Sequence, residues 1–113
     1  MRQEPRLNRK LVLEETVRTP DGAGGWNETW VALGIHWAEM QARTGNEKGD
    51  DVQVLSGANY RFILRAMPYG APSRPRPEQR FRAGARLFRI LAVSDHDPAG
   101  RYIACHVREE VVT

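Results

Sequence analysis

Short runs of alternating apolar and polar residues recur along the chain, and this two-residue period is typical of β-strands. The pattern predicts strands over residues 10–18, 26–31, 33–42, 60–67, 86–94 and 101–107. Residues 19–25 and 95–100 contain Pro, Asp-Gly, Gly-Gly and Asp-Pro steps that are typical of hairpin turns. We therefore expect an all-β fold, a small β-barrel or sandwich of five to six mostly antiparallel strands with at most one short helix.

The same alternation predicts the side chains of the core. They are Leu11, Leu13, Trp30, Trp37, Phe62, Leu64, Phe88, Ile90 and Ile103. Residues 33–42 also contain good helix formers, but no N-cap residue precedes them, so a strand is favoured. In that strand Ile35 and Trp37 alternate with His36 and Ala38.

Polar segments divide the rest of the chain. Residues 1–9 are expected to form a flexible N-terminal arm, and residues 10–113 a single β-barrel domain. Within this domain, residues 43–59 are polar, contain three Gly and predict a long loop. Residues 68–78 contain four Pro and predict a Pro/Arg-rich loop, because proline cannot donate a ladder hydrogen bond in a central strand.

Composition limits the size and stability of the domain. A chain of 113 residues corresponds to one domain, and only 24 of these are Leu, Ile, Val or Phe. So few large apolar residues can form only a small core, which suggests that neighbouring copies of the chain contribute to the stability of the domain. The lone cysteine, Cys105, cannot form an internal disulfide, and we expect no signal peptide and no membrane segment.

Charge is unevenly distributed. Residues 1–59 carry a net charge of −2 and residues 60–113 a net charge of +5, with eight Arg between positions 61 and 89. A basic segment with interleaved aromatic residues could bind phosphates, as single-strand-binding barrels do, or an acidic protein surface. Alternatively, these arginines are simply the solvated face of strands whose aromatic residues form the core.

The sequence offers little for catalysis or for binding a metal. Cys105 and His106 are neighbours in a predicted strand, so their side chains point to opposite faces. The run Asp95-His96-Asp97 is explained by turn formation, and no second ligand cluster exists to complete a zinc site. No Gly-x-Ser-x-Gly motif occurs, and the Gly-rich segment is not followed by a helix. We therefore expect no enzyme activity, no metal and no cofactor.

The order of these features resembles that of the head–tail joining proteins of tailed bacteriophages, also called head-closure, stopper or head–tail adaptor proteins. The residues that carry the resemblance are Leu7-Asn8-Arg9-Lys10, Glu28-Thr29-Trp30, Trp37-Ala38, Thr44-Gly45-Asn46-Glu47, the strand from Tyr60 to Arg65, and the run from Gly84 through Phe88 and Ile90 to Val93. The Pro-rich insertion and residues 50–55 depart from the family pattern.

The resemblance implies a structural ring in a phage or a phage-like gene transfer agent. Such a homo-oligomeric ring would lie between the portal or adaptor protein and the tail terminator or tail-tube protein, around double-stranded DNA that passes without sequence-specific contacts. It implies assembly in the bacterial cytoplasm and a final place at the head–tail junction of the particle. The alternatives are a tail terminator or other tail-side ring protein, and a small basic nucleic-acid-binding barrel.

The resemblance also implies a functional loop, and the chemistry of arginine suggests a second functional region. The loop that could project into the channel and close it corresponds to Arg43, Thr44, Gly45, Asn46, Glu47, Lys48, Gly49, Asp50, Asp51, Val52 and Gln53. Acidic residues there would repel DNA phosphates. The hypothesis for the second region is a ring or partner interface formed by Arg74, Arg76, Arg80, Arg82 and Arg86, since the planar guanidinium suits protein interfaces.

Overall fold

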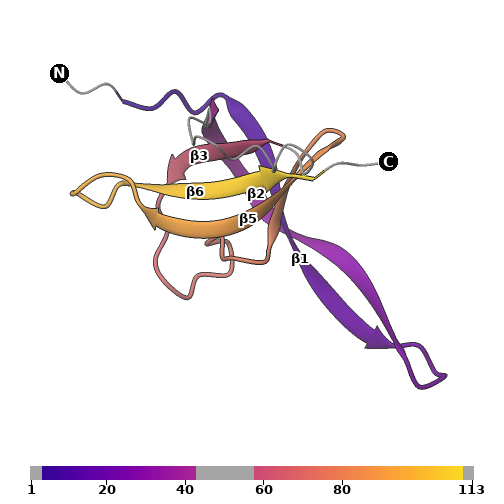
Figure 1. The fold of residues 1–113 in the computed structure, drawn as a ribbon. Coiled ribbons are helices and arrows are strands. Elements are labelled where there is room, and N and C mark those ends of the chain that lie inside the picture. Colours follow the sequence, from indigo (N-terminus) through magenta and orange to yellow (C-terminus); the bar gives the residue numbers. More distant parts are fainter. Residues whose placement is uncertain (1–3, 43–57, 111–113) are drawn as a thin grey trace, which may run out of the picture.

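The computed structural model describes residues 4–42 and 58–110, and within them the chain forms one β-sheet closed into a barrel. The strands are β1 (Arg9–Pro20), β2 (Trp26–Ala42), β3 (Asn59–Arg65), β4 (Arg80–Ala83), β5 (Arg86–Asp95) and β6 (Tyr102–Glu109). Their order around the barrel is β1-β2-β3-β6-β5-β4, and every neighbouring pair is antiparallel (Figure 1). No helix occurs in the described part, so the predicted all-β fold class is confirmed.

The interior of the barrel is filled by aliphatic side chains around three phenylalanines. Phe62 packs edge-to-face on Phe81 and Phe88, with ring centroids 5.7 and 5.1 Å apart. The buried cluster consists of Leu11, Leu13, Ala38, Phe62, Leu64, Phe81, Phe88, Ile90, Ile103, Cys105 and Val107. Seven of the nine side chains predicted for the core lie in it.

The two tryptophans predicted for the core do not join this cluster. The sequence pattern suggests two strands separated near Ala32, but β2 is continuous over 17 residues. Across the bulge at Leu33, Trp30 pairs with Thr16 and Trp37 pairs with Lys10, and these two β1 residues stand on the face opposite to the buried Leu11 and Leu13, so both tryptophans stand on the outer face. The barrel interior receives His36 and Ala38, whereas Trp37 is 52% exposed on the outer face and its core assignment is wrong. Trp30 is half-buried under the guanidinium of Arg80.

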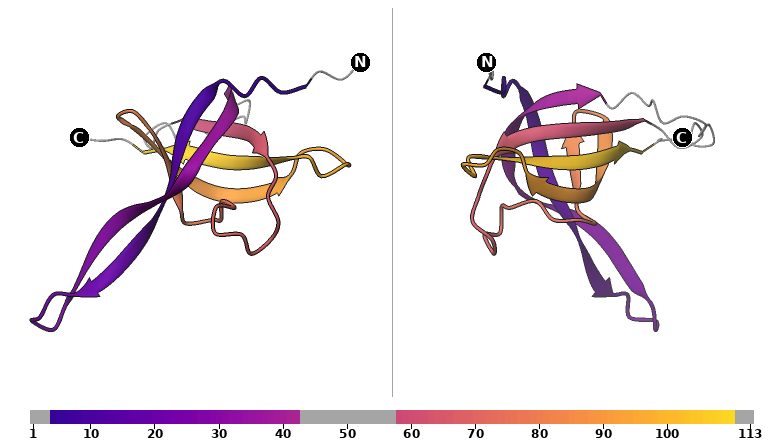
Figure 2. Two further views of the ribbon diagram at one scale, coloured as in Figure 1. Left: turned by 180° about the vertical axis from the view of Figure 1, so that it is seen from behind. Right: turned by 60° about the vertical axis from the view of Figure 1, so that its left-hand side comes forward.

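A twisted two-stranded ribbon projects from the barrel. β1 pairs with β4 only over Val12–Glu14, whereas its pairing with β2 continues to Pro20↔Trp26. Residues 16–31, which we call the β-arm, therefore extend away from the other strands (Figures 1 and 2). The arm gives the molecule its long dimension of 59 Å, against 37 and 22 Å in the other directions.

Strand β4 closes the barrel between β1 and β5. Its four residues follow the Pro/Arg-rich loop, and Phe81 at its second position is completely buried. The alternation pattern missed this strand because four residues hold too few alternations to stand out after a Pro-rich segment.

Residues before β1 contact the outside of the barrel. Leu7 packs on a small outer cluster of Ile63, Tyr102 and Ala104. The backbone N–H of Arg6 donates to Glu39 Oε1 at 2.7 Å, and this bond lowers the pKa of Glu39. The described part of the predicted N-terminal arm thus lies against the sheet.

Candidate functional site

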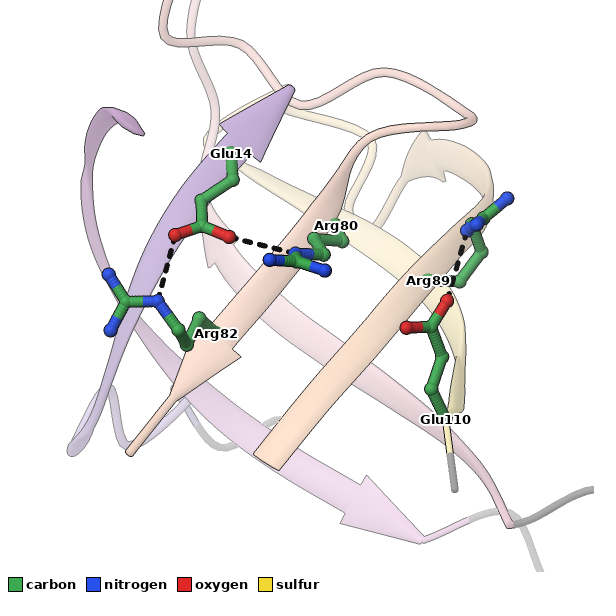
Figure 3. Close-up of polar contacts among 5 residues, drawn as sticks. All are labelled: Glu14, Arg80, Arg82, Arg89 and Glu110. Carbon is green, nitrogen blue, oxygen red and sulfur yellow. Dashed lines mark hydrogen bonds and ion pairs between the residues drawn. The ribbon is translucent and has the colours of Figure 1, made fainter. Parts of the chain in front are cut away.

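The arginines predicted as an interface surround a buried carboxylate. Glu14 on β1 lies between two arginines of β4, with Oε1 accepting from Arg80 Nε and Oε2 from Arg82 Nε, both at 2.8 Å (Figure 3). Both bonds are ion pairs, and Glu14 is itself buried. Two of the five predicted interface residues are therefore partners of a carboxylate of their own chain.

The pairing of β1 with β4 explains why a glutamate is buried at this position. Leu13 lies opposite Phe81 and points into the barrel, whereas Glu14 lies opposite Arg80 on the outer face, where the two arginines cover it. Burial alone would raise the pKa of Glu14, but the hydrogen bonds and positive charges of Arg82 and Arg80 lower it below its ordinary value. The carboxylate is thus ionised at neutral pH.

The same cluster fixes the base of the β-arm. The guanidinium of Arg80 lies over the ring of Trp30, 4.0 Å from its centroid. On the neighbouring side, Arg76 Nη2 and Gln79 Nε2 both donate to Glu15 Oε1 at 3.2 Å. The loop and β4 therefore hold the point where the arm leaves the barrel.

Two further predicted interface residues are also bonded within the chain. Arg86 forms a bidentate pair with Glu109, with N–O distances of 2.9 and 3.0 Å, which raises the pKa of Arg86 and lowers that of Glu109. Arg74 is buried, donates to the carbonyl oxygen of Met67 at 2.7 Å, and stacks on Tyr69. Arg76 is the most exposed of the five, with 67% of its side chain accessible.

A further charged contact involves Arg89 of β5. Arg89 lies beside Glu110, with Nε 3.3 Å from Oε2 (Figure 3). Its Nη1 is also 3.4 Å from Glu78 Oε1. The Nε–H does not point along a hydrogen bond to Glu110, so this is an ion pair only. The Arg-rich region is therefore largely a network that joins strands, with less free positive charge than its composition suggests.

The other sequence predictions fall in two groups. Residues 43–53, the predicted channel loop, lie outside the described residues.

The residues considered for metal binding or catalysis have structural roles. Asp97 belongs to a turn, where its carboxylate accepts hydrogen bonds from the backbone N–H groups of Arg101 and Tyr102. Cys105 is buried, and this burial raises the pKa of its thiol to about 12. In residues 4–42 and 58–110 no group of three potential ligands could hold a metal, and no helix there is long and apolar enough to cross a membrane.

Exposed apolar side chains form the surfaces that sequence reasoning missed. Ile35 and Trp37 line an outer groove on the barrel, and Trp26 lies near the tip of the β-arm. The signal for them was in β2, where apolar residues occupy neighbouring positions, so that some of their side chains must point outward.

Comparison with known proteins assigns the family. The family model described as "Phage head completion protein" matches residues 2–110. A chain in a solved structure titled "Virion of native gene transfer agent (GTA) particle" is similar, with 53% identity, a TM-score of 0.74, and coverage of 97% of this chain and 100% of that chain.

A second similar structure supports the fold alone. It is the solution structure of a protein from Shigella flexneri 2a, with 18% identity, a TM-score of 0.70, and coverage of 96% of this chain and 97% of that one. No curated protein matches the sequence. The resemblance to head–tail joining proteins is confirmed at the level of the family. The chain belongs to the phage head completion protein family, and its place is in the virion.

Proposed function

We propose that this protein is a structural connector that forms a homo-oligomeric ring at the head–tail junction of a phage or gene transfer agent. The ring lies between the portal or adaptor and the tail proteins and encloses the channel through which double-stranded DNA passes. The observation that carries the proposal is the family match over residues 2–110, together with 53% identity to a chain of a gene transfer agent virion.

The internal pairing of the arginines supports a structural role. Glu14, Glu109 and Glu110 neutralise arginines that a nucleic-acid-binding surface would need to present to phosphates. Contacts between protein subunits are then carried by apolar side chains and by the exposed Arg76. The structural character of the family supports a non-enzymatic role. Closure of the channel by residues 43–59 stays a prediction from the sequence.

Particles produced without this protein test the proposal. Heads and tails should both form but remain unjoined in electron micrographs, and addition of the purified protein should restore joined particles. Normal yields of complete particles without it would contradict the proposed role. Tail terminator function predicts a different defect, namely tails of irregular length.

Salt dependence tests the alternative of a nucleic-acid-binding barrel. If the protein acted by binding free oligonucleotides, the logarithm of the affinity would fall steeply with the logarithm of salt concentration. We expect weak binding with a shallow slope, since five of the eight arginines between positions 61 and 89 form an ion pair with a carboxylate of their own chain.

A further inference from the structure

The outer face of the barrel presents an apolar surface with cations on both sides. Ile35 and Trp37 are 56% and 52% exposed and line a groove. Lys10 is the cross-strand neighbour of Trp37 on β1, so both side chains stand on the same face. Arg65 lines the same groove from the β3 side. We call this surface the Trp37 groove.

The β-arm carries an exposed aromatic side chain and a carboxylate, which complement the apolar groove and the cations beside it. Trp26 is 58% exposed, and Glu28 stands on the same face of β2 two residues further on. Arg18 covers part of Trp26, with its guanidinium carbon 5.3 Å from the ring centroid. Residues 16–31 contain Arg18, Asp21 and Glu28 and so carry a net charge of −1, opposite in sign to the edges of the groove.

The β-arm also needs a covering partner. A two-stranded ribbon on its own is only marginally stable in water, because neither of its faces packs on a core. Beyond the base held by Arg80, the barrel of its own chain does not cover the arm (Figure 2). A packed surface on another molecule would supply the missing burial.

The arm cannot reach the groove of its own chain. Trp26 and Trp37 lie on the same continuous strand, 11 residues apart, which corresponds to about 36 Å along the chain. We propose that the β-arm of one copy docks, through Trp26 and Glu28, onto the Trp37 groove of the next copy. Because the two surfaces differ, this contact is heterologous, and its repetition around an axis closes a ring. The inference deepens the proposed ring and rests on it.

A zero-length cross-linker tests this contact in assembled particles. Carbodiimide joins a lysine amine to a carboxylate in direct contact with it. Within one chain, Lys10 and Glu28 are separated by about nine residues of strand, or about 30 Å, so a Lys10–Glu28 link must join two copies. We expect mass spectrometry to find this link, or a Lys10–Asp21 link, in wild-type particles and not in those of Lys10→Arg, which keeps the charge.

Mixing two variants of the purified protein tests the head-to-tail geometry. Trp26→Asp damages the arm and leaves the groove, whereas Trp37→Asp does the opposite. We expect each variant alone to sediment as a monomer at concentrations where the wild type forms higher oligomers, and the mixture to form a heterodimer held by the one intact arm–groove contact. Leu91→Asp is the matched control, because Leu91 is 51% exposed on β5 and lies outside both surfaces. This variant should associate as the wild type does.

The outcomes separate this contact from the proposed ring itself. If both Trp variants associate like the wild type, or if particles give no link from Lys10 to the arm, the ring is built through other surfaces and the arm–groove contact is wrong. A symmetric dimer unaffected by mixing would also overturn it. Failure of the proposed function is seen independently, as complete particles that form without the protein.

Discussion

Arg80 connects Trp30 to Glu14: its guanidinium lies 4.0 Å from the centroid of the indole ring, while its Nε donates to the carboxylate at 2.8 Å. One arginine thus joins the base of the β-arm to the strand that closes the barrel. Removing either partner should therefore affect both the stability of the barrel and the position of the arm.

The first prediction concerns the charge of Glu14. In Glu14→Gln the side chain keeps its size but loses the ionic bonds to Arg80 and Arg82. We expect the free energy of unfolding to fall by about 2 kcal/mol, because two arginines are left without a carboxylate at a buried position. Urea unfolding at pH 7 followed by circular dichroism measures this difference.

Glu78→Gln serves as the control for that measurement. The Glu78 side chain is 85% exposed and its contact with Arg89 is long at 3.4 Å, so its loss should change stability by less than about 0.5 kcal/mol. Equal effects of the two substitutions would contradict a special role for Glu14.

The second prediction is the pH dependence of this contribution. Because its two arginines lower the pKa of Glu14 in the folded protein, the ionised group stabilises the fold above about pH 4.5, its ordinary value. The stabilisation decreases as pH falls below that value, because the unfolded state binds the proton first, and it is lost once pH has passed through the lower folded value. The difference in unfolding free energy between wild type and Glu14→Gln should therefore be largest above pH 5 and shrink toward pH 3. A difference that stays constant with pH would show that the charge is not responsible.

The third prediction concerns the reactivity of Cys105. Burial raises the pKa of this thiol to about 12, and only the thiolate reacts with disulfide reagents. In native protein at pH 8, labelling should proceed no faster than unfolding, and it should become rapid in denaturing urea. Rapid labelling without denaturant would mean that β6 opens locally.

The fourth prediction concerns His36, which links β2 to the Pro/Arg-rich loop. Its Nε2 lies 2.8 Å from the carbonyl oxygen of Ser73, so the neutral ring donates to that oxygen. Burial lowers the pKa of His36 below 6.5, despite this bond. The stability that depends on neutral His36 is present above pH 6.5 and decreases as pH falls from there, because the unfolded state binds the proton first. NMR titration should give a midpoint below 6.5 in the native protein and near 6.5 in urea.

Much of the barrel could be predicted from the sequence, because most strands alternate regularly and their turns contain Gly, Pro and Asp. Leu11, Leu13, Phe62 and Phe88 follow this alternation and lie in the core. The assignment failed for Trp37, because bulky apolar residues stand on both faces of β2 while the interior receives His36 and Ala38.

The arginines show a different limit of sequence reasoning. Composition places eight of them between positions 61 and 89, but it does not reveal that Glu14, far away in the chain, lies between two of them. That contact depends on the pairing of β1 with β4, which sets Glu14 opposite Arg80 across a long stretch of chain and leaves no local signal in the sequence.

The junction between the β-arm and the barrel also has a geometric consequence for assembly. Five residues of ribbon beyond the barrel, Thr16 to Pro20, span about 17 Å, so a rotation of about 10° at the base moves the tip by about 3 Å. In a ring built through the β-arm, the angle between the arm and the barrel fixes the rotation that relates each subunit to the next. The number of subunits that complete a circle is then set by how Glu14, Arg80 and Trp30 pack.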